Sequence, residues 1–210
     1  MKIQTEKTLY IIGGANGSGK STAESIFFGG AGLNFVNADN IAESDDLMPT
    51  STNTGRALFA QFDKNYTKHA SFVYETTLSG KDYNSRISRA KKEGYSVELL
   101  YVFLPSVEIN LERVGNRSKK GGHNVKEEVV RRRYKRSLAN FDDVCKKATS
   151  WRVYDNSDET QQCRLIATGT GDDVNVVDET LYKRFIDCKA QAIEQVRAER
   201  LERAAKNLSK

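Results

Sequence analysis

The stretch GGANGSGKST, residues 13–22, decides the fold, because it follows the short apolar run TLYII and precedes a segment with helical spacing. From Gly14 to Ser21 it fits the pattern G-x-x-x-x-G-K-[ST] at every fixed position. In such a P-loop, backbone N–H groups turn inward around a phosphate, and the following helix adds its positive end. The pattern predicts that Lys20 reaches the β and γ phosphates of ATP and that Ser21 ligates Mg²⁺. The predicted nucleotide-binding residues are Gly14, Ala15, Asn16, Gly17, Ser18, Gly19, Lys20, Ser21 and Thr22.

The composition of the whole chain is that of one mildly basic α/β domain. The 210 residues are 38% hydrophobic, which is enough for one sizeable core. Lys and Arg number 33 against 28 Asp and Glu, a net charge of +5 that mildly favours anionic ligands. The three cysteines lie far apart without C-x-x-C spacing, so we expect neither a zinc site nor a disulfide framework. The first apolar run is too short for a signal peptide or a membrane span, and we expect a cytoplasmic protein.

Five apolar, β-branched or aromatic runs predict strands that alternate with helical patterns. These runs cover residues 8–14, 34–39, 71–77, 95–104 and 151–156. Together with the P-loop, the alternation predicts an α/β P-loop NTPase fold with three α/β/α layers and a mostly parallel sheet of five to six strands. We expect a P-loop domain over residues 1–177. Residues 178–210 read as an amphipathic C-terminal helix, which either packs on the domain or docks on a partner.

Two internal helices are predicted from their apolar spacing. The first follows residue 53, and its apolar positions are Leu58, Phe59, Phe62 and Tyr66. The second covers residues 126–141, and its apolar stripe is Val130, Tyr134, Leu138 and Phe141. On this second helix Arg131 and Arg133 flank the stripe, whereas Arg132 and Arg136 are expected to face outward.

Acidic side chains end two of the predicted strands. Asp39 closes the run NFVNAD, and Glu75 with Thr77 closes SFVYETT. Ligands of open α/β sheets bind at the carboxyl ends of the strands, so Asp39 and Glu75 are expected to face the crevice beside the P-loop. A carboxylate there can accept the proton of an attacking hydroxyl. For Asp39 the alternative is an N-cap of the next helix.

Residues around 113–140 are rich in arginine and predict a lid. The arginines are Arg113, Arg117, Arg131, Arg132, Arg133 and Arg136, with Gly121 and Gly122 between them. Arg113 and Arg117 share a helix face. Arginines on a closing segment neutralise the charge that phosphoryl transfer spreads over the equatorial oxygens. For at least half of these six arginines, an ordinary place on a solvent-exposed helix face is an equally good interpretation.

A polar turn follows the fifth predicted strand. Asp155, Asn156 and Ser157 stand just past this strand. A loop at this place can wrap around the adenine of a bound nucleotide. An ordinary Asx turn explains the same residues nearly as well.

Taken in order, these motifs resemble the zeta-toxin-like P-loop ATPases of bacteria over residues 8–168. The motifs are the P-loop, Val36–Asp39, Glu75–Gly80, Arg113 with Arg117, Gly121-Gly122-His123, Arg132-Arg133-Tyr134 and Tyr154–Ser157. This chain departs from the zeta toxins at two positions. Ser79 stands where they have an arginine, and His123 stands where they have a second lid arginine.

The resemblance implies a P-loop fold of the nucleotide-kinase type. It also implies transfer of the ATP γ-phosphoryl group to a hydroxyl of a small acceptor, with a UDP-N-acetylsugar as first candidate and growth inhibition as the result. It implies that Lys20 and Ser21 hold ATP and Mg²⁺ and that Asp39 is the general base. It also makes an antitoxin protein a candidate partner. The residues expected to act on the transferred phosphate are Lys20, Arg113 and Arg117, and those expected around the acceptor are Asp39, Glu75, Thr77, Ser79, His123 and Arg133.

Two other functions remain open from the sequence. In one, the chain is a regulatory ATPase or nucleotide-dependent binding module whose C-terminal segment carries a partner. In the other, the basic segment binds RNA and the acceptor is an RNA end. Nucleic acid is disfavoured, because Tyr134 is the only aromatic residue in the basic run and stacking platforms are therefore missing.

Overall fold

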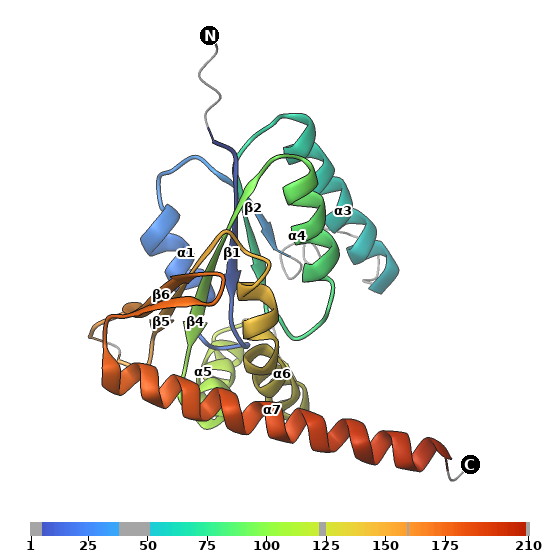
Figure 1. Cartoon of the computed structure of the whole chain (residues 1–210), viewed down its shortest axis with the longest axis vertical. Coiled ribbons are helices and arrows are strands. Elements are labelled where there is room, and N and C mark those ends of the chain that lie inside the picture. The colour runs from blue at the N-terminus through green and yellow to red at the C-terminus, as the bar shows by residue number, and fades with distance from the viewer. Residues whose placement is uncertain (1–5, 38–50, 122–124, 159, 209–210) are drawn as a thin grey trace.

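One twisted sheet organises the chain, and helices cover both of its faces (Figure 1). The computed structural model describes residues 6–37, 51–121, 125–158 and 160–208. The sheet has seven strands in the order β2-β3-β1-β4-β5-β6-β7. Their bounds are β1 Thr8–Gly13, β2 Asn34–Asn37, β3 Phe72–Thr76, β4 Ser96–Phe103, β5 Ser150–Asp155, β6 Arg164–Thr170 and β7 Asp173–Val176. The three-layer, mostly parallel fold predicted from the sequence is confirmed.

The sheet is larger than the predicted five to six strands. Strands β1 to β5 pair in parallel and correspond to the five predicted runs. The additional strands β6 and β7 form an antiparallel extension beside β5. The sequence of β7, DVNV, is mostly exposed at the edge of the sheet, so no apolar run marks it. The predicted strand number was therefore too low.

Six helices surround the sheet in the described residues. They are α1 Lys20–Phe28, α3 Ser51–Thr67, α4 Tyr83–Lys92, α5 Val107–Lys119, α6 Glu127–Cys145 and α7 Glu179–Leu208. Helices α3, α4, α6 and α7 contribute to the larger apolar core, and α1 contributes to the smaller one. Along β4, Leu99 and Tyr101 point into the larger core and Leu100 and Val102 into the smaller core. This burial on both faces is typical of a parallel sheet.

Three of the four apolar positions predicted for the first internal helix are buried in the structure. Leu58, Phe62 and Tyr66, spaced by four residues, are buried in the larger core. Phe59, the fourth of these apolar positions, is 52% exposed. One position along a helix turns a side chain by about 100°, and Phe59 therefore leaves the buried face. Its ring instead lies 5.3 Å from the guanidinium of Arg86.

Helix α7 packs on the domain from its start to Val196, and its C-terminal end extends beyond the domain (Figure 1). The Phe185 side chain is fully buried, and its ring centroid lies 5.1 Å from that of Phe103 and 5.0 Å from that of Phe141. Near the other end, Leu201 is 64% exposed. Packing on the domain thus explains the buried apolar residues of α7 up to Val196. Docking of the C-terminal end of α7 on a partner stays a prediction. None of the described helices is both long and apolar enough to cross a membrane.

We predict that Phe185→Ala lowers the free energy of unfolding by about 3–5 kcal/mol, because the substitution leaves a cavity among buried rings. Urea denaturation followed by far-UV circular dichroism measures this change. Leu201→Ala on the same helix is the control and should change the free energy by less than about 0.5 kcal/mol, because Leu201 is exposed. Equal midpoints for Phe185→Ala and the unmodified protein would mean that α7 is not docked.

Candidate functional site

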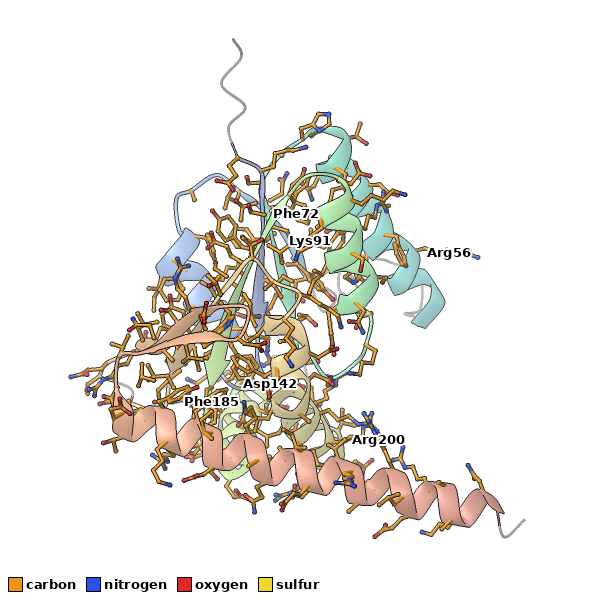
Figure 2. All side chains as sticks on the ribbon, viewed as in Figure 1. Arg56, Phe72, Lys91, Asp142, Phe185 and Arg200 are labelled. Atoms are coloured by element: carbon orange, nitrogen blue, oxygen red, sulfur yellow. The ribbon has the colours of Figure 1, made fainter. Side chains whose placement is uncertain are left out.

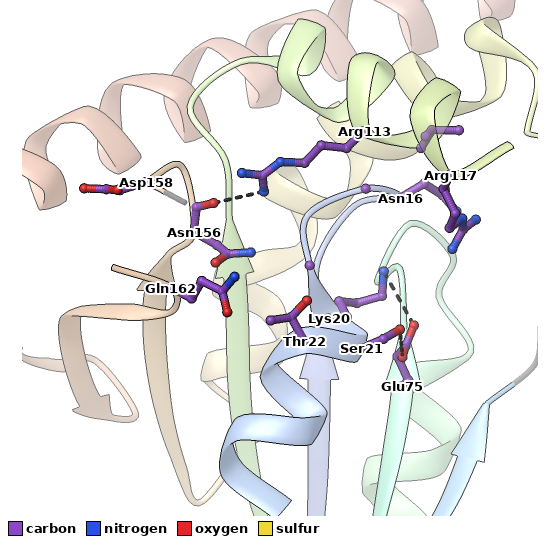
Figure 3. Close-up of a pocket in the computed structure, with 13 residues that line it drawn as sticks. Asn16, Lys20, Ser21, Thr22, Glu75, Arg113, Arg117, Asn156, Asp158 and Gln162 are labelled. Atoms are coloured by element: carbon purple, nitrogen blue, oxygen red, sulfur yellow. Dashed lines mark hydrogen bonds and ion pairs between the residues drawn. The ribbon is translucent and has the colours of Figure 1, made fainter. Parts of the chain in front are cut away.

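The carboxyl ends of the central parallel strands meet at a cavity of about 470 Å³. Strand β1 leads directly into the glycine-rich loop, and Gly13 pairs with Thr76 at the end of β3. Figure 3 shows the side chains around this cavity. It is lined by Asn16, Gly17, Gly19, Lys20, Ser21, Thr22, Glu75, Arg113, Val114, Arg117, Asn156, Asp158 and Gln162.

The backbone of the loop requires glycine at two points in particular. Gly17 and Gly19 have φ angles of 79° and 95°, in the left-handed region that side chains other than glycine rarely adopt. A Cβ atom on Gly17 would also lie 2.5 Å from the carbonyl oxygen of Asn110. Gly19 is the N-cap of α1, no side chain caps this end, and the first turn holds no acidic residue. The first N–H groups of α1 are therefore available to an anion.

Lys20 and Glu75 form a buried ion pair at the mouth of the loop (Figure 3). The Lys20 Nζ lies 3.7 Å from Glu75 Oε1 and donates to the carbonyl oxygen of Ala15 at 3.1 Å. Ser21 Oγ donates to Glu75 Oε2 at 3.4 Å. Glu75 thus connects the lysine and the hydroxyl of the P-loop motif from the end of β3. The lysine is 7% and the glutamate 9% exposed, so each would be costly to bury without the other.

The Glu75 carboxylate lies beside the Ser21 hydroxyl, and Glu24 is close enough to Glu75 for their charges to interact. Burial, and then the negative charge of Glu75, raise the pKa of the Glu24 carboxyl on α1 above its ordinary value. In the described part of the chain no three His, Cys, Asp or Glu side chains form a group that could hold a metal ion. Mg²⁺ needs no such group, because it usually takes one or two protein oxygens and completes its shell with phosphate and water. The hydroxyl of Ser21 and the neighbouring carboxylates fit this requirement.

Three side chains from other elements hold the loop in place. Asn156, just past β5, donates from Nδ2 to the carbonyl oxygen of Ser18 at 2.8 Å. Asn110 of α5 donates to the carbonyl oxygen of Asn16 at 2.7 Å. Arg133 of α6 donates to the side-chain oxygen of the same Asn16 at 3.1 Å. The loop is therefore tied to α5, α6 and the end of β5.

The arginines predicted to form a lid have different environments. Arg113 and Arg117 both extend from α5 to the cavity, and Arg113 donates to the carbonyl oxygen of Asn156 at 3.0 Å (Figure 3). Arg131 instead forms exposed ion pairs with Glu108 and Glu127, which contribute little to stability. Hydrogen bonds from Ser106 and Arg131 lower the pKa of Glu108 to about 2.

Two further arginines lie on α6. Arg132 is exposed, as expected. Arg136 was expected to face outward but is half-buried, and it lines a second cavity together with residues of α7. The sequence prediction was wrong because α7 packs across this side of α6.

The remaining predicted residues are distributed over several environments. Asp39 and His123 lie outside the described residues. Thr77 and Ser79 share a hydrogen bond of 2.9 Å, and Ser79 lines the second cavity. Asp155 accepts hydrogen bonds from the backbone N–H and the hydroxyl of Ser157, which is the Asx turn that the sequence left open.

Sequence reasoning missed several residues of this site. Asn110, Asp158 and Gln162 were not predicted, although the first holds the loop and the other two line the cavity. Asn110 could have been found, because it precedes Arg113 by three residues and therefore shares its helix face. Asp158 and Gln162 lie in an irregular segment after β5, and no spacing rule indicates them.

A glycine-rich turn that leads from a central parallel strand into a helix beginning Lys-Ser defines a P-loop NTPase fold. Residues 37–165 match the model of the zeta toxin family. The chain belongs to the zeta toxin family. The match begins after the P-loop, reaches into β6 and leaves out α7.

The chain is also similar to one further protein sequence and to solved structures. An uncharacterized protein of Haemophilus influenzae is 37% identical over 124 residues, which cover 58% of this chain and 88% of that protein. The fold is similar to a crystal structure of AvrRxo1-ORF1 and -ORF2 with ATP, with a TM-score of 0.66 and 21% identity over 87% of this chain and 64% of that one. It is also similar to a structure of the PezAT toxin-antitoxin system of Streptococcus pneumoniae, with a TM-score of 0.58 and 12% identity over 92% and 88%. This chain spans less than two thirds of the AvrRxo1 chain, and at these identities the structural likeness shows the fold alone.

We predict that Asn156→Ala lowers the free energy of unfolding by about 1–3 kcal/mol, because the carbonyl oxygen of Ser18 and the N–H of Cys163 lose their partner. The same change should weaken nucleotide binding, since the loop loses one of its ties. Asn116→Ala on the exposed side of α5 is the control and should alter neither property. Thermal unfolding and titration with a fluorescent ATP analogue measure both effects. Unchanged binding by Asn156→Ala would contradict a positioning role.

Proposed function

We propose that this protein is a Mg²⁺-dependent kinase that transfers the γ-phosphoryl group of ATP to a hydroxyl of a small acceptor. The observation that carries the proposal is the contact of Lys20 and Ser21 with Glu75. It joins the motif that holds phosphates to the end of β3, where an acceptor can enter. Membership of the zeta toxin family supports the same reaction.

In this proposal the P-loop binds the phosphates of ATP. The N–H groups at the start of α1 contact the phosphate oxygens, and Lys20 exchanges its contacts with Ala15 and Glu75 for the β and γ phosphates. Ser21 would hold Mg²⁺, which would supply positive charge to neutralise the phosphates. Asn156 lines the cavity, and in this proposal the adenine binds at its end of the cavity. The crystallisation of a similar fold with ATP supports this part.

Transfer requires a base for the acceptor and positive charge for the phosphoryl group. Asp39 follows the last residue of β2 by two positions, and that residue, Asn37, pairs with Glu75 across the sheet. Two residues of chain span at most about 7 Å, so Asp39 can act on an acceptor held beside Glu75. Arg113 and Arg117 approach from α5 and neutralise charge on the phosphoryl oxygens.

The acceptor and partners follow from the family. A UDP-N-acetylsugar is the first candidate acceptor, and Thr77 with Glu75 would contact it. An antitoxin is the proposed protein partner, as in the toxin-antitoxin system whose structure has a similar fold. A cytoplasmic location of the protein, where ATP is abundant, is consistent with these proposals.

We predict a new phosphorylated product when the protein is incubated with ATP, Mg²⁺ and either UDP-N-acetylglucosamine or a bacterial metabolite extract. Mass spectrometry identifies the product, and Lys20→Ala serves as the blank. Phosphate on the sugar nucleotide would establish reaction and acceptor together. Phosphate on another metabolite would keep the kinase and replace the acceptor. Release of ADP and free phosphate alone would contradict the kinase and favour a regulatory ATPase.

We predict that Asp39→Asn reduces transfer by roughly 10²- to 10⁴-fold while ATP binding stays nearly unchanged, because the variant lacks only the base. Lys20→Ala should instead weaken ATP binding and transfer together. Single-turnover transfer and equilibrium titration with ATP separate the two effects. Asp172→Asn is a control on the exposed turn before β7. Normal turnover by Asp39→Asn would exclude Asp39 as the base.

A further inference from the structure

The turn after β3 contains a residue in an unusual backbone conformation. Leu78 has a φ angle of 53°, in the left-handed region that bulky side chains rarely adopt. Its side chain is 1% exposed, so the surrounding protein encloses it. Such a strained residue persists only where its surroundings hold it, and residues of this kind cluster at functional sites. The contacts that hold Leu78 therefore bear on function.

The Leu78 side chain lies over the last residue of β1. A Cβ atom on Gly13 would lie 2.3 Å from Cδ1 and 3.0 Å from Cγ of Leu78, so the leucine fills the space that a side chain at position 13 would need. Gly13 directly precedes Gly14, the first residue of the P-loop pattern. A hydrogen bond of 2.9 Å between Thr77 and Ser79 draws the turn together around Leu78. The turn after β3 thus packs against the start of the P-loop.

Asn140 of α6 holds this turn from outside. Its Nδ2 donates to the carbonyl oxygen of Leu78 at 2.7 Å and to that of Gly80 at 3.2 Å, so the amide spans the turn. Both partners are acceptors, and the amide nitrogen is the only donor of an asparagine side chain. Asn140 is 6% exposed, and a buried carbonyl that loses its donor costs free energy. The Asn140 amide therefore fixes the segment that follows Glu75.

Asn140 belongs to a line of polar contacts on α6. Arg133, Ser137 and Asn140 are spaced by four and three residues and share one face of the helix. Arg133 donates to the side-chain oxygen of Asn16 in the P-loop, and Ser137 shares a hydrogen bond of 3.0 Å with the hydroxyl of Tyr101 on β4. One helix thus contacts the P-loop through its first turns and the turn after β3 further along.

Apolar contacts fix the position of α6 independently of these polar ones. Val130, Leu138 and Val144 of α6 are buried. The ring centroid of Phe141 lies 5.0 Å from that of Phe185, which Figure 2 shows on the side of α7 that faces the rest of the molecule. Removal of a single polar side chain is therefore expected to leave α6 in place, and its effect should be local.

We propose that Asn140 is a positioning residue for phosphoryl transfer, because it holds the turn after β3 against the P-loop. The inference rests on the proposed kinase activity and adds a residue that lies outside the P-loop cavity. Glu75 and Thr77, the residues proposed to contact the acceptor, stand three positions and one position before Leu78. A turn that is ordered in advance loses less entropy when the acceptor binds and keeps it in the reacting geometry.

Hydrogen exchange followed by mass spectrometry tests the turn without any transfer reaction. In Asn140→Ala we expect peptides that cover residues 76–82 to exchange about tenfold faster or more, because the turn opens more readily without its donor. Ser137→Ala is the matched control, since it removes a buried hydrogen bond from the same face of α6 and leaves the contacts of the turn intact. Unchanged exchange in Asn140→Ala, or equal acceleration in both variants, would overturn the proposal.

A transfer assay then shows whether the ordered turn serves the acceptor. With the acceptor found in the metabolite extract, Asn140→Ala should lower kcat/KM for the acceptor about tenfold or more and change the KM for ATP by less than about twofold, because the P-loop keeps its own ties. Asn140→Leu fills the space without a donor and should be impaired like Asn140→Ala. Normal transfer by Asn140→Leu, an equal rise in the KM for ATP, or an equal loss in Ser137→Ala would overturn the positioning role.

The positioning role and the kinase activity can fail separately. If the unmodified protein phosphorylates no acceptor, the kinase proposal fails, and the role of Asn140 in transfer fails with it. If the unmodified protein transfers phosphate and Asn140→Ala does so equally well, the positioning role alone is wrong.

Discussion

The inward turn of the P-loop backbone is the constraint on which the rest of the site depends. N–H groups that point toward a ligand leave neighbouring carbonyl groups pointing outward, and a buried carbonyl without a donor costs free energy. In this protein each of three such carbonyls has a donor. Lys20 donates to Ala15, Asn110 to Asn16, and Asn156 to Ser18. The ends of β5 and α5 are therefore positioned by what the loop requires.

The need to satisfy the carbonyl groups of the P-loop also links this loop to the helices that carry the arginines. Asn16 accepts from Asn110 of α5 at its backbone oxygen and from Arg133 of α6 at its side chain. Both helices are thus placed relative to the loop by contacts within the protein. Arg113, one turn further along α5 than Asn110, is held over the cavity by the carbonyl of Asn156. Such preorganisation lowers the entropy lost when the groups gather around a phosphate.

The features that could be predicted from the sequence are those that local patterns of residues determine. The P-loop follows a known motif, in which glycines allow the backbone conformation that the loop needs. Strands β1 to β5 are apolar runs, and they are buried because helices cover both faces of the sheet. The hairpin of β6 and β7 was not predicted, because the exposed β7 has no apolar pattern. Arg136 was placed wrongly because α7 packs against it, and Asp158 and Gln162 were missed because their irregular segment follows no local pattern. Tertiary packing, which no single segment encodes, sets these features.

The contacts of helix α7 change from apolar to charged where the helix leaves the domain. Phe185, Ala192 and Val196 are buried, but Leu201 is exposed, so apolar burial ends before the helix does. Beyond Val196, Glu199 still forms an ion pair with Lys135 of α6. Arg200 and Arg203 line the second cavity together with Arg136. Like charges gathered in one cavity repel one another, so the burial of Val196 and the ion pair of Glu199 hold the helix here against that repulsion.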